Sequence, residues 1–389
     1  MTSHTPESSD TSERPMDASG RSMASRRRFI QATGAVGTAA VAGCLGGGTT
    51  ELNVLTWEGY GTDAIVDTFE SEHDATVNIS LLSSDPEGLN ILESGGTEDY
   101  DLLTLNNTWA ARHAEAGTIE PLSPDDFPAM ENFLSEFQWP FSSFEYDDEM
   151  YALPTRWGWD TLTVNTNQVE EGHYDSYEVL WTGGPDGQYT DRMGIMDWPT
   201  WNIPKIAQTL GYPPFEQTDE QLDDVFDHLV QMFDQFTAIY SGTSAIRQAF
   251  LQEDIVISPV GNFTMSELRA EGNDWVNVVL PEQGGMQWTE GMCLVKDPSD
   301  RELAIEFMNT VISPEGQRSI AWEPAAKSPP VNTESFDLFS ADEQEALMFT
   351  EEGFSAAEEI ANRTTPYEFS PMTDQWTDMW EEAKAESSI

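Results

Sequence analysis

Apolar residues along the chain follow two different spacings, which predict where strands and helices lie. Short apolar and β-branched runs predict strands at residues 52–57, 76–82, 101–105, 161–165, 193–196, 255–258, 275–280 and 292–295. Segments with helical spacing predict helices at residues 63–69, 86–93, 108–116, 203–210, 244–251, 264–270, 302–311 and 374–384. Because strands and helices alternate, we expect an α/β fold with mostly parallel sheets flanked by helices.

The clearest predicted helix begins after Thr218. Thr218 and Gln221 have the spacing of a capping box, in which each side chain bonds the other residue's backbone. Apolar residues then recur every three or four positions, at Leu222, Val225, Phe226, Leu229, Phe233 and Phe236. This stripe predicts a buried helix face that belongs to the core and not to a ligand site.

Aromatic residues gather next to the predicted strands. Trp57 and Tyr60 stand at the end of the predicted strand 52–57, and Trp109 follows the strand 101–105. Trp157 and Trp159 precede the strand 161–165, Trp198 and Trp201 follow the strand 193–196, and Trp288 lies in the turn before the strand at 292. Ligands of open α/β sheets bind outside the carboxyl ends of the strands. We therefore expect these clusters to line a ligand site.

Carboxylates stand beside these indoles, at Glu58, Asp160, Asp197 and Glu290. Indole faces attract cations, with each good contact contributing roughly 0.5–2 kcal/mol. The combination predicts a site for an organic cation.

Catalytic and metal-binding signatures are absent from the sequence. The five histidines are far apart, and no nucleophile-elbow, P-loop or zinc-protease motif occurs. Cys293, in an apolar run, is expected to be a buried structural thiol. We predict no catalytic residue, metal or cofactor. Two other classes stay open: a secreted lyase or hydrolase with Asp160 or Glu290 as base, and an acidic surface scaffold without a pocket.

The first 43 residues have the features of an export signal. Paired arginines at Arg26 and Arg27 precede an apolar run at 32–42 that is shorter than the ~20 residues needed to span a bilayer. The pattern resembles a twin-arginine signal, and the sequence ending at Cys44 resembles a lipobox. We therefore expect Cys44 to carry the lipid, with residues 44–50 as its flexible tether, on the extracellular face of the cell membrane.

The charge balance is strongly acidic. The chain has 70 acidic and 17 basic residues, a net charge of −53, and only four lysines. The negative electrostatic field of such a chain repels other polyanions. This excludes nucleic acid and anionic membranes as partners. With 42 aromatic residues the chain is expected to fold, and molar salt would screen its repulsion, as in a halophile.

Several motifs together resemble the substrate-binding proteins of ABC importers for spermidine and putrescine, which have the type II periplasmic-binding-protein fold. They are LNVLTWEGY at 52–60, YDLL at 100–103, YALP at 151–154 followed by Trp157 and Gly158, LGY at 210–212, and VVLPEQGG at 278–285 leading to Trp288 and Glu290. The likeness runs along nearly the whole mature chain. It implies a two-lobed protein with a ligand cleft between the lobes.

The resemblance also implies roles for site residues. By likeness, Trp57 and Tyr60 form aromatic walls, Trp288 stacks on the ligand, and Glu290 holds an amine. The chain departs from the family where its polyamine binders place two carboxylates, because Trp198 and Trp201 stand there instead. Val260 stands near the place of a family tryptophan. A ligand with one cationic head, such as choline, betaine or thiamine, is then as plausible as a polyamine.

We therefore predict a monomeric, lipid-anchored solute-binding protein that delivers a small organic cation to ABC permease subunits. The first lobe is expected to comprise residues 51–157 and 290–333, and the second residues 158–289 and 334–389. The chain would cross between the lobes near residues 157–158 and 289–290.

Overall fold

The structure is a computed structural model that describes residues 50–347, 354–387 and 389 of the 389-residue chain. The export signal, the lipid site at Cys44 and nearly all of the tether therefore lie outside the described residues.

Seven strands form the first sheet, in the order β14-β13-β3-β1-β2 with β4 and β7 also paired to β13. Strand β1 runs parallel to β2 and β3, and β13 runs antiparallel to β3, β4 and β7. The bounds are β1 Thr50–Thr56, β2 Ala75–Leu81, β3 Leu102–Asn106, β4 Ile119–Glu120, β7 Leu153–Asp160, β13 Gly285–Val295 and β14 Thr364–Pro366.

Five strands form the second sheet, in the order β10-β9-β11-β8-β12. Strand β9 is parallel to β10 and β11, whereas β8 is antiparallel to β11 and β12. The bounds are β8 Leu162–Asn165, β9 Met193–Met196, β10 Phe236–Tyr240, β11 Ile257–Ser258 and β12 Val276–Val279, and a separate hairpin joins β5 Glu145–Tyr146 to β6 Glu149–Met150. Both main sheets are mixed, and their five antiparallel pairings equal the parallel ones in number, so they are less parallel than the sequence predicts.

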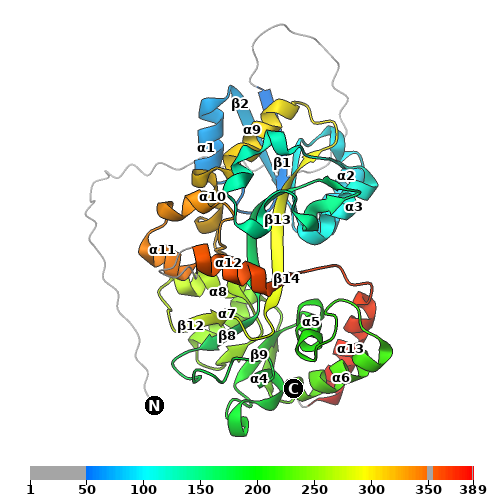
Figure 1. Ribbon diagram of the computed structural model, residues 1–389, viewed down its shortest axis with the longest axis vertical. Helices are drawn as coiled ribbons and strands as arrows, with labels where there is room; N and C mark the ends of the chain where they lie inside the picture. Colours follow the sequence, from blue (N-terminus) through cyan, green and yellow to red (C-terminus); the bar gives the residue numbers. More distant parts are fainter. Residues whose placement is uncertain (1–49, 348–353, 388) are drawn as a thin grey trace, which may run out of the picture. The chain divides into compact units, whose positions relative to one another are not determined.

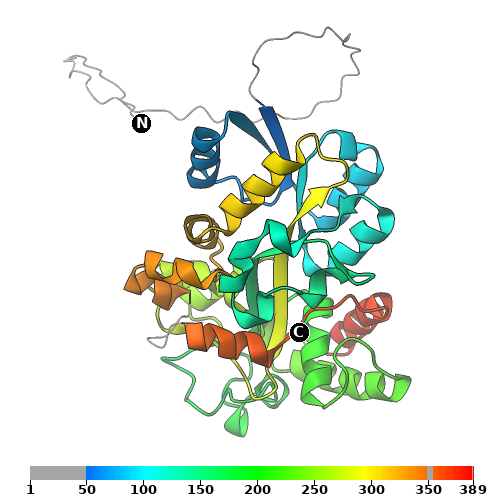
Figure 2. The same ribbon diagram turned by 45° about the horizontal axis from the view of Figure 1, so that its top comes forward.

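Helices pack on both sheets, and α1 lies beside α9 in both views (Figures 1 and 2). The helices are α1 Asp63–Glu72, α2 Asp85–Glu93, α3 Ala110–Ala116, α4 Val179–Thr182, α5 Pro199–Thr209, α6 Asp219–Phe233, α7 Thr243–Leu251, α8 Asn262–Ala270, α9 Arg301–Ile312, α10 Pro314–Trp322, α11 Ala341–Ala346, α12 Phe354–Arg363 and α13 Thr373–Glu386. In the described part of the chain, none of them combines the length and apolarity that crossing a membrane demands.

Two long strands connect the sheets, and the sequence did not reveal them. We expected Trp288 in a turn, but it lies within β13, which spans 11 residues and extends through the middle of the molecule in Figure 1. Along most of its length β13 pairs with β7, whose eight residues are all buried. A strand that is buried on both faces lacks the alternation of apolar and polar residues that identifies half-buried strands. The lobe boundaries given above stay a prediction.

Two helix boundaries also differ from the predictions. Helix α6 has the predicted capping box at Thr218, but it ends at Phe233, and Phe236 begins β10 instead of continuing the helix face. Helix α5 begins at Pro199, four residues earlier than expected, because proline is favoured in the first turn, where no N–H is needed. Trp201 is consequently a helical residue. Cys293 is buried as predicted, and burial raises the pKa of its thiol well above the ordinary value.

Candidate ligand-binding site

A cavity of about 350 Å³ lies beside the first sheet, and strands of that sheet line it together with helices and loops that follow strands of either sheet. It is built from the ends of β3 and β7, the first turns of α2, α5 and α8, the middle of β13 and the residue after β14. The lining residues are Asp85, Asn106, Asn107, Thr108, Trp159, Asp160, Trp198, Trp201, Gly261, Phe263, Thr264, Trp288, Glu290 and Tyr367. The volume is within the usual range for small-molecule pockets, about 300–1,000 Å³.

A glycine in β7 makes room for the indole of Trp288. Gly158 pairs with Trp288 across the two strands, and a Cβ at Gly158 would lie only 2.4 Å from Cζ2 of that indole. The Trp288 ring can therefore lie flat over the strand only because residue 158 has no side chain. Phe263, at the start of α8, contacts the same indole edge to face, with ring centroids 5.8 Å apart.

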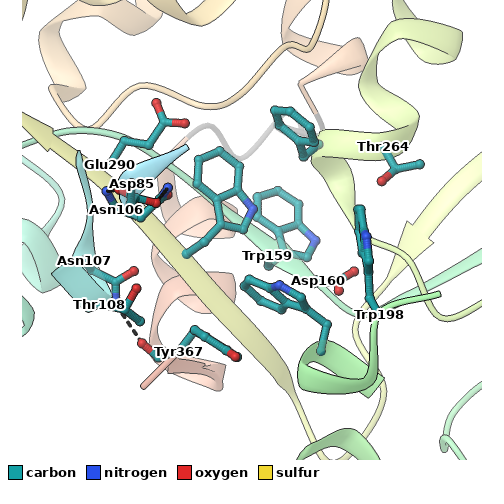
Figure 3. Close-up of a pocket in the computed structure, with 14 residues that line it drawn as sticks. Asp85, Asn106, Asn107, Thr108, Trp159, Asp160, Trp198, Thr264, Glu290 and Tyr367 are labelled. Atoms are coloured by element: carbon teal, nitrogen blue, oxygen red, sulfur yellow. Dashed lines mark hydrogen bonds between the residues drawn. The ribbon is translucent and has the colours of Figure 1, made fainter. Parts of the chain in front are cut away.

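Another part of the cavity wall is made by the start of α5. Trp198 precedes this helix, and Trp201 stacks on Tyr367 with ring centroids 4.3 Å apart. The backbone carbonyl of Tyr367 accepts a hydrogen bond from Asn107 Nδ2 at 2.7 Å, shown as a dashed line in Figure 3. Six aromatic side chains in all line the cavity, so the pocket is suited to stacking and cation–π contact.

Asp85 is one of two carboxylates on the same side of the cavity (Figure 3). Its oxygens accept hydrogen bonds from Asn106 N and Asn106 Nδ2, both at 2.9 Å. Burial raises the pKa of Asp85, the bonds from Asn106 partly oppose this, and the nearby Glu290 charge adds to it. Among the described residues, no lysine, arginine or histidine side chain forms an ion pair with Asp85.

Glu290 is the second carboxylate and is held by a buried network. Its Oε2 accepts a hydrogen bond from Tyr60 Oη at 2.9 Å and lies 3.8 Å from a guanidinium nitrogen of Arg156. Tyr60 Oη is also 2.6 Å from Thr155 Oγ1. Burial raises the pKa of Tyr60 well above 10, so the phenol remains a hydrogen-bond donor.

Asp160 lies across the cavity from this pair, next to Trp198 (Figure 3). Its Oδ2 is 3.0 Å from Nζ of the buried Lys205, so its charge is already paired inside the protein. Three carboxylates line the cavity, and Arg156 and Lys205 compensate two of them. One negative charge is therefore left for a ligand to balance.

The structure brings together half of the residues that the sequence proposed. Trp198, Trp201, Trp288 and Glu290 line the cavity, as does Asp160. Four others lie elsewhere: Trp57, Tyr60, Trp109 and Trp157.

Each of these four has other surroundings. Tyr60 is fully buried behind Glu290, and Trp157 is fully buried and donates from Nε1 to Pro330 O at 3.1 Å. Trp109 lies 4.7 Å from the Arg112 guanidinium, and Trp57 is half-buried against the core. The side chains that precede or follow a strand alternate in direction, so adjacency to a strand end does not fix which of them face the cleft.

Sequence reasoning missed Asp85, the three polar residues at the end of β3 and just after it, and the aromatic residues Phe263 and Tyr367 as site residues, whereas Trp159 belongs to a cluster that was expected to line the site. Asp85 directly precedes Pro86, and the proline alone was sufficient to explain the start of that helix. A carboxylate at the first turn of a helix is ordinarily stabilised by the helix dipole, so nothing in the sequence pattern assigned a ligand to Asp85.

Comparisons with known proteins agree with this architecture. The family described as bacterial extracellular solute-binding protein matches residues 64–350. The chain is 22% identical over 275 residues to the putrescine-binding periplasmic protein SpuD of Pseudomonas aeruginosa, covering 68% of this chain and 74% of that protein. It is 19% identical over 271 residues to the spermidine/putrescine-binding periplasmic protein of Salmonella typhimurium, covering 69% and 75%.

Solved structures show the same fold. The spermidine/putrescine ABC transporter substrate-binding protein PotD from Streptococcus pneumoniae, in complex with calcium and HEPES, superposes with a TM-score of 0.73 at 18% identity, covering 87% of this chain and 99% of that one. The predicted two-lobed periplasmic-binding-protein-like fold is thereby confirmed, and the match over residues 64–350 shows that the chain belongs to the bacterial extracellular solute-binding protein family.

Proposed function

We propose that this protein is the solute-binding component of an ABC importer and that its pocket captures a small organic cation of the amine class. The observation that carries this proposal is the pairing of Asp85 and Glu290 on one side of an aromatic cavity. Burial and the neighbouring Glu290 charge raise the pKa of Asp85, so the ionised form of Asp85 costs free energy unless a cation compensates it. Asp85 has no such cation among the described residues, so a ligand ammonium would supply it.

The aromatic walls favour the same class of ligand. Trp159 lies between the two acidic sides of the cavity in Figure 3, and Trp198, Trp201 and Trp288 also present indole rings to the cavity. Several cation–π contacts of roughly 0.5–2 kcal/mol and one charge-assisted hydrogen bond would reach micromolar affinity, about 8 kcal/mol, after the cost of ordering the ligand. The names of the two curated relatives, which refer to putrescine and spermidine, point to amines as well.

A quaternary ammonium or another amine, such as choline, betaine or thiamine, is the alternative ligand. Six aromatic side chains line the cavity, whereas two of its three carboxylates are already paired with basic residues of the protein. The cavity therefore favours a ligand that is bound by contacts with aromatic rings more than by several salt bridges. In either case the protein binds and releases its solute without making or breaking a covalent bond, by closure of the lobes around the ligand.

Isothermal titration calorimetry in molar KCl tests the proposal. Butylamine, 1,4-diaminobutane, spermidine and choline form the cation panel, and butyrate and butanol are matched anionic and neutral controls. We expect binding only within the cation panel. Binding of butyrate or butanol with the affinity of butylamine would contradict the proposal. Native mass spectrometry of the protein purified in high salt would identify solutes that accompany it.

Replacing Trp288 by alanine is expected to weaken cation binding by roughly 5- to 150-fold, about 1–3 kcal/mol, because the ligand loses a stacking and cation–π surface. Trp275→Ala is the matched control, since Trp275 is also half-buried but lies outside the cavity. Calorimetry with the best ligand of the panel measures both variants. An equal loss in the two would assign the effect to folding and not to the pocket.

We further propose that the protein is exported by the twin-arginine pathway and held at the extracellular face of the membrane by a lipid on Cys44. Cys44→Ser is expected to release the protein from washed membranes, because one lipidated cysteine is the anchor that the sequence offers. Replacing Arg26 and Arg27 by lysine should instead leave unprocessed precursor inside the cell. Immunoblots of membrane, medium and cytosol measure both, and membrane retention of Cys44→Ser would contradict the lipid anchor.

A further inference from the structure

One face of helix α5 continues from the pocket wall to a buried lysine. Trp198 and Trp201 line the cavity, and Lys205 follows four residues after Trp201, on the same face of the helix. Lys205 is one of only four lysines in the chain and the only one that is buried, with 1% of its surface exposed. An ammonium inside a protein is tolerated only where groups of the protein satisfy it, so this lysine is a costly feature.

The contacts of Lys205 are directed at the pocket carboxylate Asp160. Its Nζ lies 3.0 Å from Asp160 Oδ2 and donates a second hydrogen bond to the Pro259 carbonyl at 2.6 Å. Asp160 also accepts a backbone hydrogen bond from Gly261. The carboxylate thus lines the cavity, but a primary ammonium already occupies the position next to it.

The opposite end of the cavity differs in this respect. Asp85 and Glu290 lie there, and only Glu290 has a basic neighbour, Arg156, at 3.8 Å. The cavity therefore has one acidic end with an uncompensated charge and one acidic end that is neutralised from within. A ligand with ammonium groups at both ends would place its second ammonium beside the Lys205 ammonium. The two positive charges would repel each other.

Resting on the proposed function, we propose that Lys205 takes the place of a second ligand ammonium, so that the pocket selects organic cations with a single positive charge over diamines of the same length. Lys205 is then a specificity-determining residue that acts through Asp160 without touching the ligand. The aromatic rings between the two ends would contact the uncharged body of the ligand.

Two substitutions and a matched control test this proposal. Lys205→Met removes the internal ammonium and frees Asp160, and Lys205→Gln removes the charge but keeps a hydrogen-bond donor, which protects the fold. Asp160→Asn combined with Lys205→Met removes both charges and leaves nothing for a second ligand ammonium. Calorimetry in molar KCl measures the affinities of butylamine and 1,4-diaminobutane for each protein.

We expect the parent to bind butylamine at least as tightly as 1,4-diaminobutane. In Lys205→Met and Lys205→Gln, the affinity ratio of diamine to monoamine should rise at least tenfold, whereas the double variant should keep the parent's ratio. 1,4-Diaminobutane should also raise the melting temperature of Lys205→Met more than butylamine does, because it restores a cation beside Asp160. If Lys205→Met does not fold, Lys205→Gln decides the outcome.

Three results would overturn the proposal. The parent could prefer the diamine by tenfold or more, the ratio could stay unchanged in both single variants, or the double variant could gain diamine affinity as the single variants do. Each of these leaves cation binding itself in place. If the parent binds neither amine nor any other cation of the panel, the proposed function fails and this inference fails with it.

Discussion

Asp85→Asn is expected to weaken cation binding by roughly 10- to 100-fold, about 1.5–3 kcal/mol, which is the scale of a hydrogen bond to a charged group. The substitution keeps the shape of the side chain and an oxygen that can accept from Asn106, but it removes the one pocket charge that has no basic partner among the described residues. Glu290→Gln should cost less, because Arg156 already balances part of the Glu290 charge.

Calorimetry with the best-bound cation measures these variants. Glu93→Gln, at the exposed end of the same helix, is the matched control for Asp85→Asn and should bind as the parent does. Asp85→Asn should not unfold more readily, since burial raises the pKa of Asp85 and its charge is therefore unfavourable in the folded protein at neutral pH. Unchanged affinity in Asp85→Asn with a large loss in Glu290→Gln would contradict this prediction. It would show that Glu290 alone balances the positive charge of the ligand.

The same carboxylate predicts a pH dependence of binding. Burial raises the pKa of Asp85 in the free protein, whereas a bound ammonium would favour the ionised form and lower that pKa. Affinity should therefore be full above the free-state pKa and fall as the pH decreases through it. Between the two pKa values binding should release a proton, which calorimetry in buffers of different ionisation enthalpy detects. Asp85→Asn should abolish that release.

The sequence predicted a part of the site, and the physical reasons for this are specific. Trp198 and Trp201 were found because ligands of α/β folds bind where strands end, whereas Trp288 and Glu290 lie inside β13 and were found because an indole next to a carboxylate stands out. Asp85 and Glu290 are far apart in the sequence and meet at Asn106, which donates hydrogen bonds to Asp85 and pairs with Glu290 where β3 joins β13. A single sequence contains no sign of that pairing.

Lys205 was overlooked for a different reason. With the helix predicted to begin at residue 203, Trp198 and Trp201 belonged to a loop, and no common face with Lys205 could be recognised. The observed start at Pro199 places all three along one side of α5. A boundary error of four residues, which is ordinary for helix ends, thus hid the relation between the pocket wall and its buried ion pair.

The long helices and regular strands of the fold were predictable from the sequence, but the short strand at the edge of the first sheet was not. Strand β14 has only three residues, which end in Pro366, so it has no periodic pattern to detect, whereas the two residues of the interior strand β11 fall within the apolar run predicted as a strand at 255–258. Proline is confined to edge strands because it cannot donate to the ladder, and β14 lies at the edge of its sheet. Such strands form because the neighbouring strand is already in place.

Dilution from molar to millimolar salt is expected to unfold the protein. Residues 44–389 contain 66 acidic and only 12 basic side chains, so internal ion pairs can compensate few of the carboxylates. The screening length grows from about 3 Å at 1 M to about 30 Å at 10 mM salt. By Coulomb's law, the repulsion of a compact body with this charge then rises by on the order of tens of kcal/mol relative to the expanded chain. That exceeds the net stability of an ordinary folded domain, about 5–15 kcal/mol.

Circular dichroism and the melting temperature, followed from 3 M to 10 mM KCl, measure this effect. We expect the melting temperature to fall steadily and the folded signal to be lost at the lowest salt; a flat melting temperature would contradict the account. Salts can also stabilise proteins by strengthening apolar burial, which sulfate does better than chloride. Potassium chloride and potassium sulfate should therefore be compared at equal ionic strength. If screening is the cause, the two salts act alike, and sucrose, which carries no charge, does not replace them.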